Sequence, residues 1–177
     1  MARVGPRFRD IPQFTRTASY QVDISWSYLL EALRGYTERD GLDLDPDFQR
    51  AHVWDEQKQV RYVEFILRGG ASGKDIYTNC PRWDRGGVKD FVLVDGKQRL
   101  QAVTKFLRSE LVIFGKYRFS DYTDSLRITQ AGFKWHVNDL DTRAEVLQWY
   151  LDLNSGGVVH TNEELERVRG LLAEEMK

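Results

Sequence analysis

The sequence predicts a mixed α/β or α+β domain, with a small mixed sheet flanked by helices. Three observations predict this class. The 177 residues suffice for one ordinary domain with its own core; 41% of them are hydrophobic and 30% charged, as in globular proteins; and short strand-like apolar segments alternate with segments of helical apolar spacing. We expect an N-terminal arm over residues 1–19 and a single domain over residues 20–177.

The first half of the chain predicts two strands and two helices. Tyr20 to Ile24 alternates between apolar and polar residues like a strand, and Trp26 to Tyr36 has helical spacing. Asp55 is suited to cap a second helix, which Gly69-Gly70 would end. Asp75 to Asn79 is typical of a further short strand.

A strand-turn-helix-strand unit is predicted next. Phe91 to Val94 is an unbroken apolar run, typical of a strand buried on both faces, and Asp95-Gly96 ends it. Helical spacing follows over Leu100 to Leu107, and the apolar run Leu111 to Phe114 favours another strand.

The last part of the chain predicts two more helices. Phe133 to Val137 is ambiguous between helix and strand, whereas Thr142 to Leu153 has helical spacing. Asn154 to Gly157 is typical of a turn that ends a helix. Thr161 and Glu164 have the spacing of a capping box at the start of the final helix.

Charge and cysteine content exclude several classes of function. With 26 Lys and Arg against 27 Asp and Glu, the net charge of −1 provides no general attraction to nucleic acid or anionic membranes. Cys80 has no partner for an internal disulfide or an all-cysteine metal site. The sequence has neither the apolar stretch of a signal peptide nor a membrane-spanning segment, so we expect a cytoplasmic protein without a membrane partner. The three histidines lack metal-ligand spacing and are expected at the surface or half-buried: His52, His136 and His160.

The strongest functional signal is Asp95-Gly96-Lys97-Gln98-Arg99, where a buried strand passes into a helix. Lys97 and Arg99 fall in the first helical turn, whose positive dipole end makes each cation unfavourable by up to about 1 kcal/mol. A phosphate bound to both and to the helix N–H groups would compensate, and Gly96 would let the backbone approach it. Asp95 would hold Mg²⁺ or orient a water. An Asp-Gly turn with exposed basic side chains and a capping Asp95 explains the pattern equally well.

Two weaker segments also present groups suited to phosphate. Arg50, after the extended segment around Pro46, has a planar guanidinium, although an exposed edge-strand arginine is the simpler interpretation. The glycine-rich turn at Asn154 to Gly157 can offer backbone N–H groups, although an ordinary helix C-cap is the simpler interpretation there.

A metal-dependent DNA nuclease is the alternative hypothesis. Asp84 followed by Asp95 and Lys97 approximates the two carboxylates and lysine with which such enzymes bind Mg²⁺ and activate water. In those sites the lysine stays on the strand, whereas Gly96 breaks the strand before Lys97.

Three motifs together resemble the N-terminal domain family of GmrSD-type restriction endonucleases, in the ParB/sulfiredoxin-like superfamily. The motifs are Asp47-Phe48-Gln49-Arg50 with Val53-Trp54, then Asp95 to Leu100, then Leu153 to Gly157 with Glu164-Leu165. The resemblance covers roughly Leu42 to Leu172. Their order and spacing make the resemblance more specific than any one motif.

The resemblance implies a compact ParB/sulfiredoxin-like fold that binds a nucleoside triphosphate, hydrolyses it in several members, and passes that event to a nuclease domain. It assigns Asp95 and Gln98 to catalysis, with Asp95 as the metal ligand and Mg²⁺ as the expected ion. It assigns nucleotide binding to these residues: Gln49, Arg50, Gly96, Lys97, Arg99, Asn154 and Gly156.

The sequence departs from the family pattern in ways that bear on catalysis. Lys97 replaces the usual first Gln of the signature, and Asp152 stands where many members have an Arg. With no nuclease domain before the end at Lys177, we expect a nuclease-bearing partner or DNA to complete any restriction function. The hypothesis is therefore nucleotide binding with slow or partner-coupled hydrolysis, and the further alternative is a catalytically inert adaptor or inhibitor.

Overall fold

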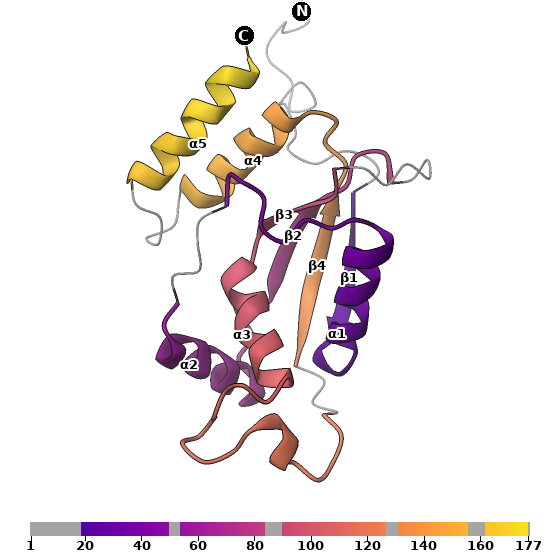
Figure 1. Ribbon diagram of the computed structural model, residues 1–177, viewed down its shortest axis with the longest axis vertical. Coiled ribbons are helices and arrows are strands. Elements are labelled where there is room, and N and C mark those ends of the chain that lie inside the picture. Colours follow the sequence, from indigo (N-terminus) through magenta and orange to yellow (C-terminus); the bar gives the residue numbers. More distant parts are fainter. Residues whose placement is uncertain (1–18, 50–53, 84–89, 127–130, 156–161, 177) are drawn as a thin grey trace, which may run out of the picture.

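The computed structural model places helices on both sides of a four-stranded sheet (Figure 1). It describes residues 19–49, 54–83, 90–126, 131–155 and 162–176. The mixed α/β class predicted from the sequence is confirmed. Residues 1–18 of the expected arm lie outside the described residues, and the single-domain assignment stays a prediction.

The sheet is mixed, with the strand order β1-β4-β2-β3. Its strands are β1 (Tyr20–Ser25), β2 (Asp75–Asn79), β3 (Val92–Asp95) and β4 (Gly132–Asn138). β4 pairs antiparallel with β1 and parallel with β2, whereas β2 pairs antiparallel with β3. The ambiguous segment Phe133 to Val137 is therefore part of a central strand.

Three helices form the main core with one face of the sheet: α1 (Trp26–Arg34), α2 (Glu56–Leu67) and α3 (Lys97–Leu107). Ser25 caps α1 and Asp55 caps α2, each accepting a hydrogen bond from a backbone N–H of the first turn. The fully buried side chains of this core come from all three helices and from the sheet, including Leu29, Val63, Val103, Ile76, Leu93 and Trp135.

Two further helices, α4 (Arg143–Ser155) and α5 (Asn162–Glu175), cover the opposite face. Leu93 packs in the first core and Val94 in a second core with Phe48, Leu147 and Val168. Successive strand residues point to opposite faces, so these two cores lie on opposite sides of β3. Burial of β3 on both faces, predicted from its apolar run, is confirmed even though β3 is an edge strand.

The outer edge of β3 is paired with a short segment before α2. The Asp43 N–H donates to the Phe91 carbonyl at 2.9 Å, and the Leu93 N–H donates to the Asp43 carbonyl at the same distance. This pairing holds the segment that contains Asp45 to Gln49 beside the end of β3. The described candidate residues of the two segments therefore lie close to one another.

The predicted strand at Leu111 to Phe114 is wrong. Ile113 forms only an isolated bridge with Tyr117, and the backbone reverses at Phe114, with φ of 52°, and Gly115, with φ of 64°. Such positive φ angles are incompatible with an extended strand. The apolar run reflects burial instead, because Leu111 and Ile113 are both inside the main core.

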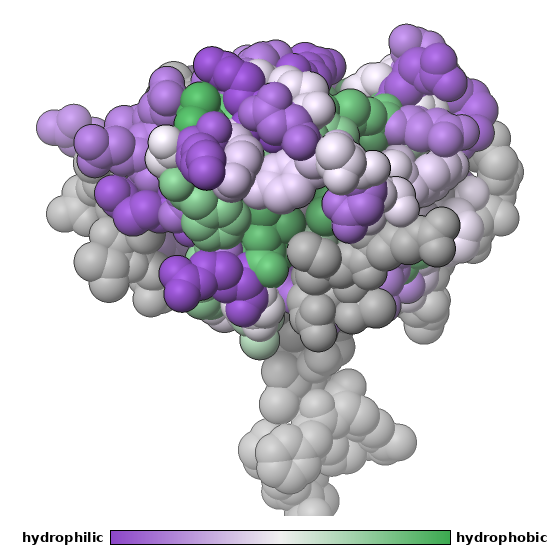
Figure 2. Space-filling view, turned by 90° about the horizontal axis from the view of Figure 1, so that it is seen from below, coloured by the Kyte–Doolittle hydropathy of each residue, from purple (hydrophilic) through white to green (hydrophobic). Residues whose placement is uncertain are grey.

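The segment after α3 closes the lower end of the molecule and includes the short 3-10 helix η4 (Phe119–Asp121). Figure 2 shows hydrophobic residues gathered on this end within a hydrophilic surround. A hollow of about 300 Å³ lies here, lined mainly by apolar side chains such as Leu67, Phe114 and Tyr122.

Several predicted helix limits are refined by the structure. The helix predicted over Trp26 to Tyr36 consists of α1, which ends at Arg34, and the start of a π-helical turn, η2 (Gly35–Arg39). Thr142 and Glu145 cap α4 reciprocally: the Glu145 N–H donates to Thr142 Oγ1 at 3.2 Å and the Thr142 N–H to Glu145 Oε2 at 3.1 Å. The predicted box at α5 depends on Thr161, which lies outside the described residues. Among the helices described, none has the length and apolar character needed to cross a membrane.

Candidate functional site

The junction of β3 and α3 places a glycine at the start of a helix. Gly96 precedes α3 with φ of 105° and has no side chain with which to cap the helix, unlike Ser25 before α1 and Asp55 before α2. A Cβ at this position would lie 2.5 Å from Ile76 Cδ1 and 3.3 Å from the Asp75 carbonyl oxygen. Only glycine combines this φ with this close packing against β2. The first-turn N–H groups of α3 therefore point toward a position that an anion would suit.

Lys97 and Arg99 leave the start of α3 in different directions. Lys97 Nζ forms an ion pair with Asp45 Oδ1. Arg99 Nη2 instead pairs with Asp95 Oδ2 at 2.6 Å and donates to the Asp75 carbonyl at 2.9 Å. Residues that are two positions apart in an α-helix are rotated by roughly 200° about the helix axis. The structure therefore does not bring the two cations together on one side of the helix, and protein groups compensate both of them.

Gln49 and Gln98 attach the segment before α2 to this junction. Gln49 Nε2 donates to the carbonyls of Leu93 at 3.1 Å and Val94 at 2.6 Å. Gln98 is buried, and its Oε1 accepts a hydrogen bond from the Trp54 N–H at 3.2 Å. Both predicted site residues lie at the junction, where these bonds position the backbone around it.

Of the remaining predicted residues, Asn154 is described and buried, and the others lie outside the described residues. Asn154 is buried near the end of α4, and its Nδ2 donates to the Tyr150 carbonyl at 2.7 Å. Tyr150 packs edge-on against Phe48, so this end of α4 lies next to the first motif. Arg50, Gly156 and Asp84 lie outside the described residues.

Arg167 of α5 is an anchor that the sequence analysis did not identify. Its guanidinium donates to three successive backbone carbonyls, those of Asp47 at 2.6 Å, Phe48 at 3.0 Å and Gln49 at 3.3 Å. The final helix is thereby tied to the first motif. An arginine more than 100 residues further along the chain carries no local signal for this contact.

A second group of polar side chains was also missed, on the face of the sheet next to Asp95. His136 Nε2 lies 2.8 Å from Asp75 Oδ1, and the His136 ring stacks on Tyr77 with centroids 4.5 Å apart. His136 is half-buried, as predicted. Burial raises the pKa of the Tyr77 hydroxyl, the charges of Asp75 and Asp95 raise it further, and Arg99 lowers it. The side chains around Asp95 thus form one electrostatically connected group.

The sheet register explains how Asp95 reaches this group. Tyr77 pairs with Asp95 and Thr78 with Leu93, so the pairing of β2 and β3 shifts by one residue between them. Such a bulge places two residues of β3 opposite one residue of β2 and redirects the side chains after it. β3 therefore ends with Asp95 beside Tyr77.

The described residues contain no group of three or more His, Cys, Asp or Glu side chains that would hold a metal ion. Mg²⁺ typically binds one or two carboxylates together with substrate phosphates. Asp95 fits that limited role, as one carboxylate at a helix start where phosphate binding is predicted, whereas the described residues do not provide a cage made by the protein alone.

The nuclease arrangement is not supported by the positions of its described members. Asp95 pairs with Arg99, whereas Lys97 is the first residue of α3 and pairs with Asp45 on another side of the helix. The third member, Asp84, lies outside the described residues.

The fold and the site together define a mixed α/β domain in which the first motif lies beside the end of β3, where the second motif begins α3, and packs against α4 through Phe48 and Tyr150. The family model described as GmrSD restriction endonuclease, N-terminal domain, matches residues 29–168. The chain therefore belongs to this family, as its motifs predicted. No curated protein and no solved structure matches the chain.

Proposed function

We propose that this domain binds a nucleoside triphosphate, with the phosphates at the start of α3. The observation that supports the proposal is the start of an 11-residue helix that follows a glycine and whose first turn contains two basic residues and no acidic one. The dipole and the backbone N–H groups at the start of such a helix favour a phosphate. Membership of the family supports the same site, because its signature falls on these residues.

The ion pairs now formed by Lys97 and Arg99 would be exchanged for phosphate. Asp45 is largely solvent-exposed, at 78% of its side chain, so its pair with Lys97 is worth at most about 1 kcal/mol. A phosphate bound at the helix dipole is a stronger acceptor than an exposed carboxylate. We expect Lys97 to contact the phosphates from one side of α3 and Arg99 from the other, and the phosphate contact of Arg50 stays a prediction from the sequence.

Transfer of Arg99 from Asp95 to phosphate would couple binding to catalysis. The transfer releases the Asp95 carboxylate, which then orients an attacking water or holds Mg²⁺; bound Mg²⁺ would neutralise charge on the phosphates. Until that release, Asp95 is occupied by Arg99, which is consistent with slow or partner-coupled hydrolysis.

The catalytic role predicted for Gln98 stays a prediction. Its bond to the Trp54 N–H supports a positioning role, in which Gln98 holds the start of the segment before α2 beside α3. Gln49 attaches the end of the first motif to β3. The binding roles of Asn154 and Gly156 stay predictions from the resemblance. We propose the ParB/sulfiredoxin-like fold for this arrangement on the basis of the same resemblance.

Isothermal titration with each of the four ribonucleoside triphosphates, with and without Mg²⁺, tests the proposal. We expect at least one to bind, and Lys97→Ala to weaken it about tenfold, or ~1.4 kcal/mol. If none of the four gives a binding signal, the nucleotide assignment is refuted. A phosphate-release assay on the same samples, with and without DNA or a nuclease-bearing partner, separates a hydrolase from an inert adaptor.

Nicking of DNA provides the test against the alternative. A nuclease would cut with Mg²⁺ and no nucleotide, and Asp95→Ala would abolish the cutting. We expect no such activity, because the described carboxylate and lysine of that arrangement do not lie together.

A further inference from the structure

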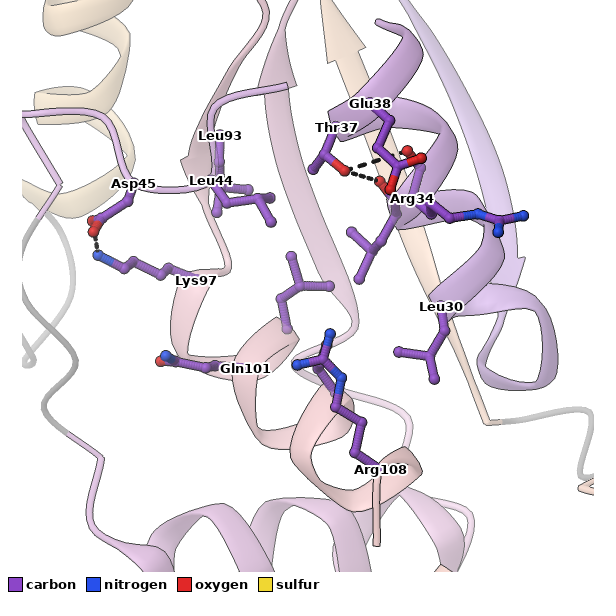
Figure 3. A pocket seen from close by; sticks show the side chains of 13 residues that line it. Leu30, Arg34, Thr37, Glu38, Leu44, Asp45, Leu93, Lys97, Gln101 and Arg108 are labelled. Atoms are coloured by element: carbon purple, nitrogen blue, oxygen red, sulfur yellow. Dashed lines mark hydrogen bonds and ion pairs between the residues drawn. The ribbon is translucent and has the colours of Figure 1, made fainter. Parts of the chain in front are cut away.

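A groove of about 550 Å³ lies between α1 and α3 on the main-core side of the sheet (Figure 3). Side chains of α3 line it at the spacing of one helix face, from Lys97 through Gln101 and Thr104 to Arg108. α1 lines the opposite wall with residues at the same kind of spacing, including Leu30 and Arg34. The groove therefore begins at the first residue of α3 and runs along the helix.

The groove has an apolar floor and a polar rim. Leu33, Leu93 and Leu100 belong to the main core and also line the groove. The rim carries positively and negatively charged side chains that can donate or accept hydrogen bonds. Among them are Arg34 and Glu38, which Figure 3 shows on the wall opposite Lys97. This combination suits a flat heterocycle joined to a hydroxyl-bearing sugar, and the volume is within the roughly 300–1,000 Å³ of small-molecule sites.

Lys97 connects this groove to the proposed phosphate site. Its side chain is only 13% exposed and ends at Asp45, which also lines the groove, and Figure 3 shows both at one end of it. The stem of Lys97 thus forms part of the wall, and its ammonium group pairs with Asp45 at the end of the groove that includes the first residue of α3. A triphosphate held there has its nucleoside next to the groove.

Gln101 provides a separate observation in the same wall. Its Oε1 is buried and has no hydrogen-bond partner within the described part of the chain. A buried acceptor without a donor is unfavourable. Rotation about the terminal side-chain bond, which is soft in glutamine, would turn this oxygen to a ribose hydroxyl or a base amino group in the groove.

We infer that the groove between α1 and α3 is the nucleoside site, in which the base and ribose of a nucleoside triphosphate lie while the phosphates lie at the start of α3. The inference rests on the proposed function and adds the location and chemistry of the remaining part of the ligand. An amphipathic helix of a partner also suits a groove between two helices. The nucleoside is favoured because the groove is continuous with the cation at the helix start.

The test compares nucleoside triphosphates with inorganic triphosphate in the full chain, by isothermal titration. In the wild type we expect the preferred nucleotide to bind at least tenfold more tightly than inorganic triphosphate. Leu30→Trp and Thr104→Trp, which fill the groove from its two walls, should remove this advantage and leave inorganic triphosphate binding unchanged. Leu30 is already 38% exposed, so its replacement leaves the core intact. Glu31→Trp, next in sequence but outside the groove lining, is the matched control and should bind like the wild type.

The possible outcomes separate failure of the nucleoside site from failure of phosphate binding. If the wild type binds inorganic triphosphate as tightly as any nucleotide, or if the filled variants keep wild-type nucleotide affinity, the nucleoside site is refuted while phosphate binding at α3 stands. If the wild type binds neither probe, the proposed function fails and the nucleoside site fails with it.

Discussion

Replacement of Gly96 by alanine tests the strand-to-helix junction on which the site is built. The alanine would keep φ near 105°, which is unfavourable for an L-residue by about 1–2 kcal/mol. Its methyl group would also lie 2.5 Å from Ile76 Cδ1, inside a packed core, where such crowding costs about 1–3 kcal/mol. We therefore expect a loss of about 3 kcal/mol in the free energy of unfolding.

Urea denaturation followed by tryptophan fluorescence measures this loss, and thermal unfolding should show a decrease of about 6–12 °C in Tm. Gly41→Ala is the matched control. Gly41 has φ of 69° but no heavy atom within 4 Å of the added Cβ, so only the backbone term applies, at about 1 kcal/mol. If Gly96→Ala loses no more stability than Gly41→Ala, the close packing of this turn against β2 is not what requires glycine.

Three further tests use Arg167, Asp45 and Cys80. Arg167→Ala should lower the free energy of unfolding by about 1–3 kcal/mol in urea denaturation, because three backbone carbonyls lose a charged donor. The control Arg169→Ala removes only an exposed ion pair with Glu166 and should change the free energy of unfolding by less than about 0.5 kcal/mol. Equal effects of the two substitutions would argue against Arg167 as an anchor. Asp45→Asn should strengthen triphosphate binding several-fold in titration calorimetry, because it removes the carboxylate that competes with phosphate for Lys97; weaker binding would place Asp45 among the groups that bind the ligand. Cys80 should resist a thiol reagent at pH 8 until the protein unfolds, because burial raises the pKa of its thiol to about 11. At pH 8 roughly one thiol in a thousand is then ionised. Rapid labelling of the folded protein would contradict this prediction.

Local patterns predicted the elements that hold the site. The unbroken run Phe91 to Val94 predicted a strand buried on both faces, and the structure buries Leu93 and Val94 in different cores. The same rule failed at Leu111 to Phe114, because an apolar run reports burial and does not report backbone direction. The positive φ of Phe114 and Gly115 reverses the chain there, and the N–H of Phe114 donates to Glu64 of α2 at 2.5 Å. That contact depends on a residue 50 positions away.

The candidate site was predictable in position but not in geometry. The order of three motifs identified the family, and Asp95 to Arg99 does begin a helix after a buried strand. Helical geometry alone predicts that Lys97 and Arg99 point in different directions, a consequence that the sequence analysis did not draw. The contacts of Arg167 and the pairing of Asp75 with His136 join distant segments, so neither leaves a local pattern.

Amide chemical shifts measured during titration with the nucleotide that binds test the central claim most directly. We expect the largest changes on the backbone N–H groups of Gly96 to Arg99, and smaller ones along the α1–α3 groove. Saturable changes confined to other parts of the molecule, with these four amides unmoved, would contradict it.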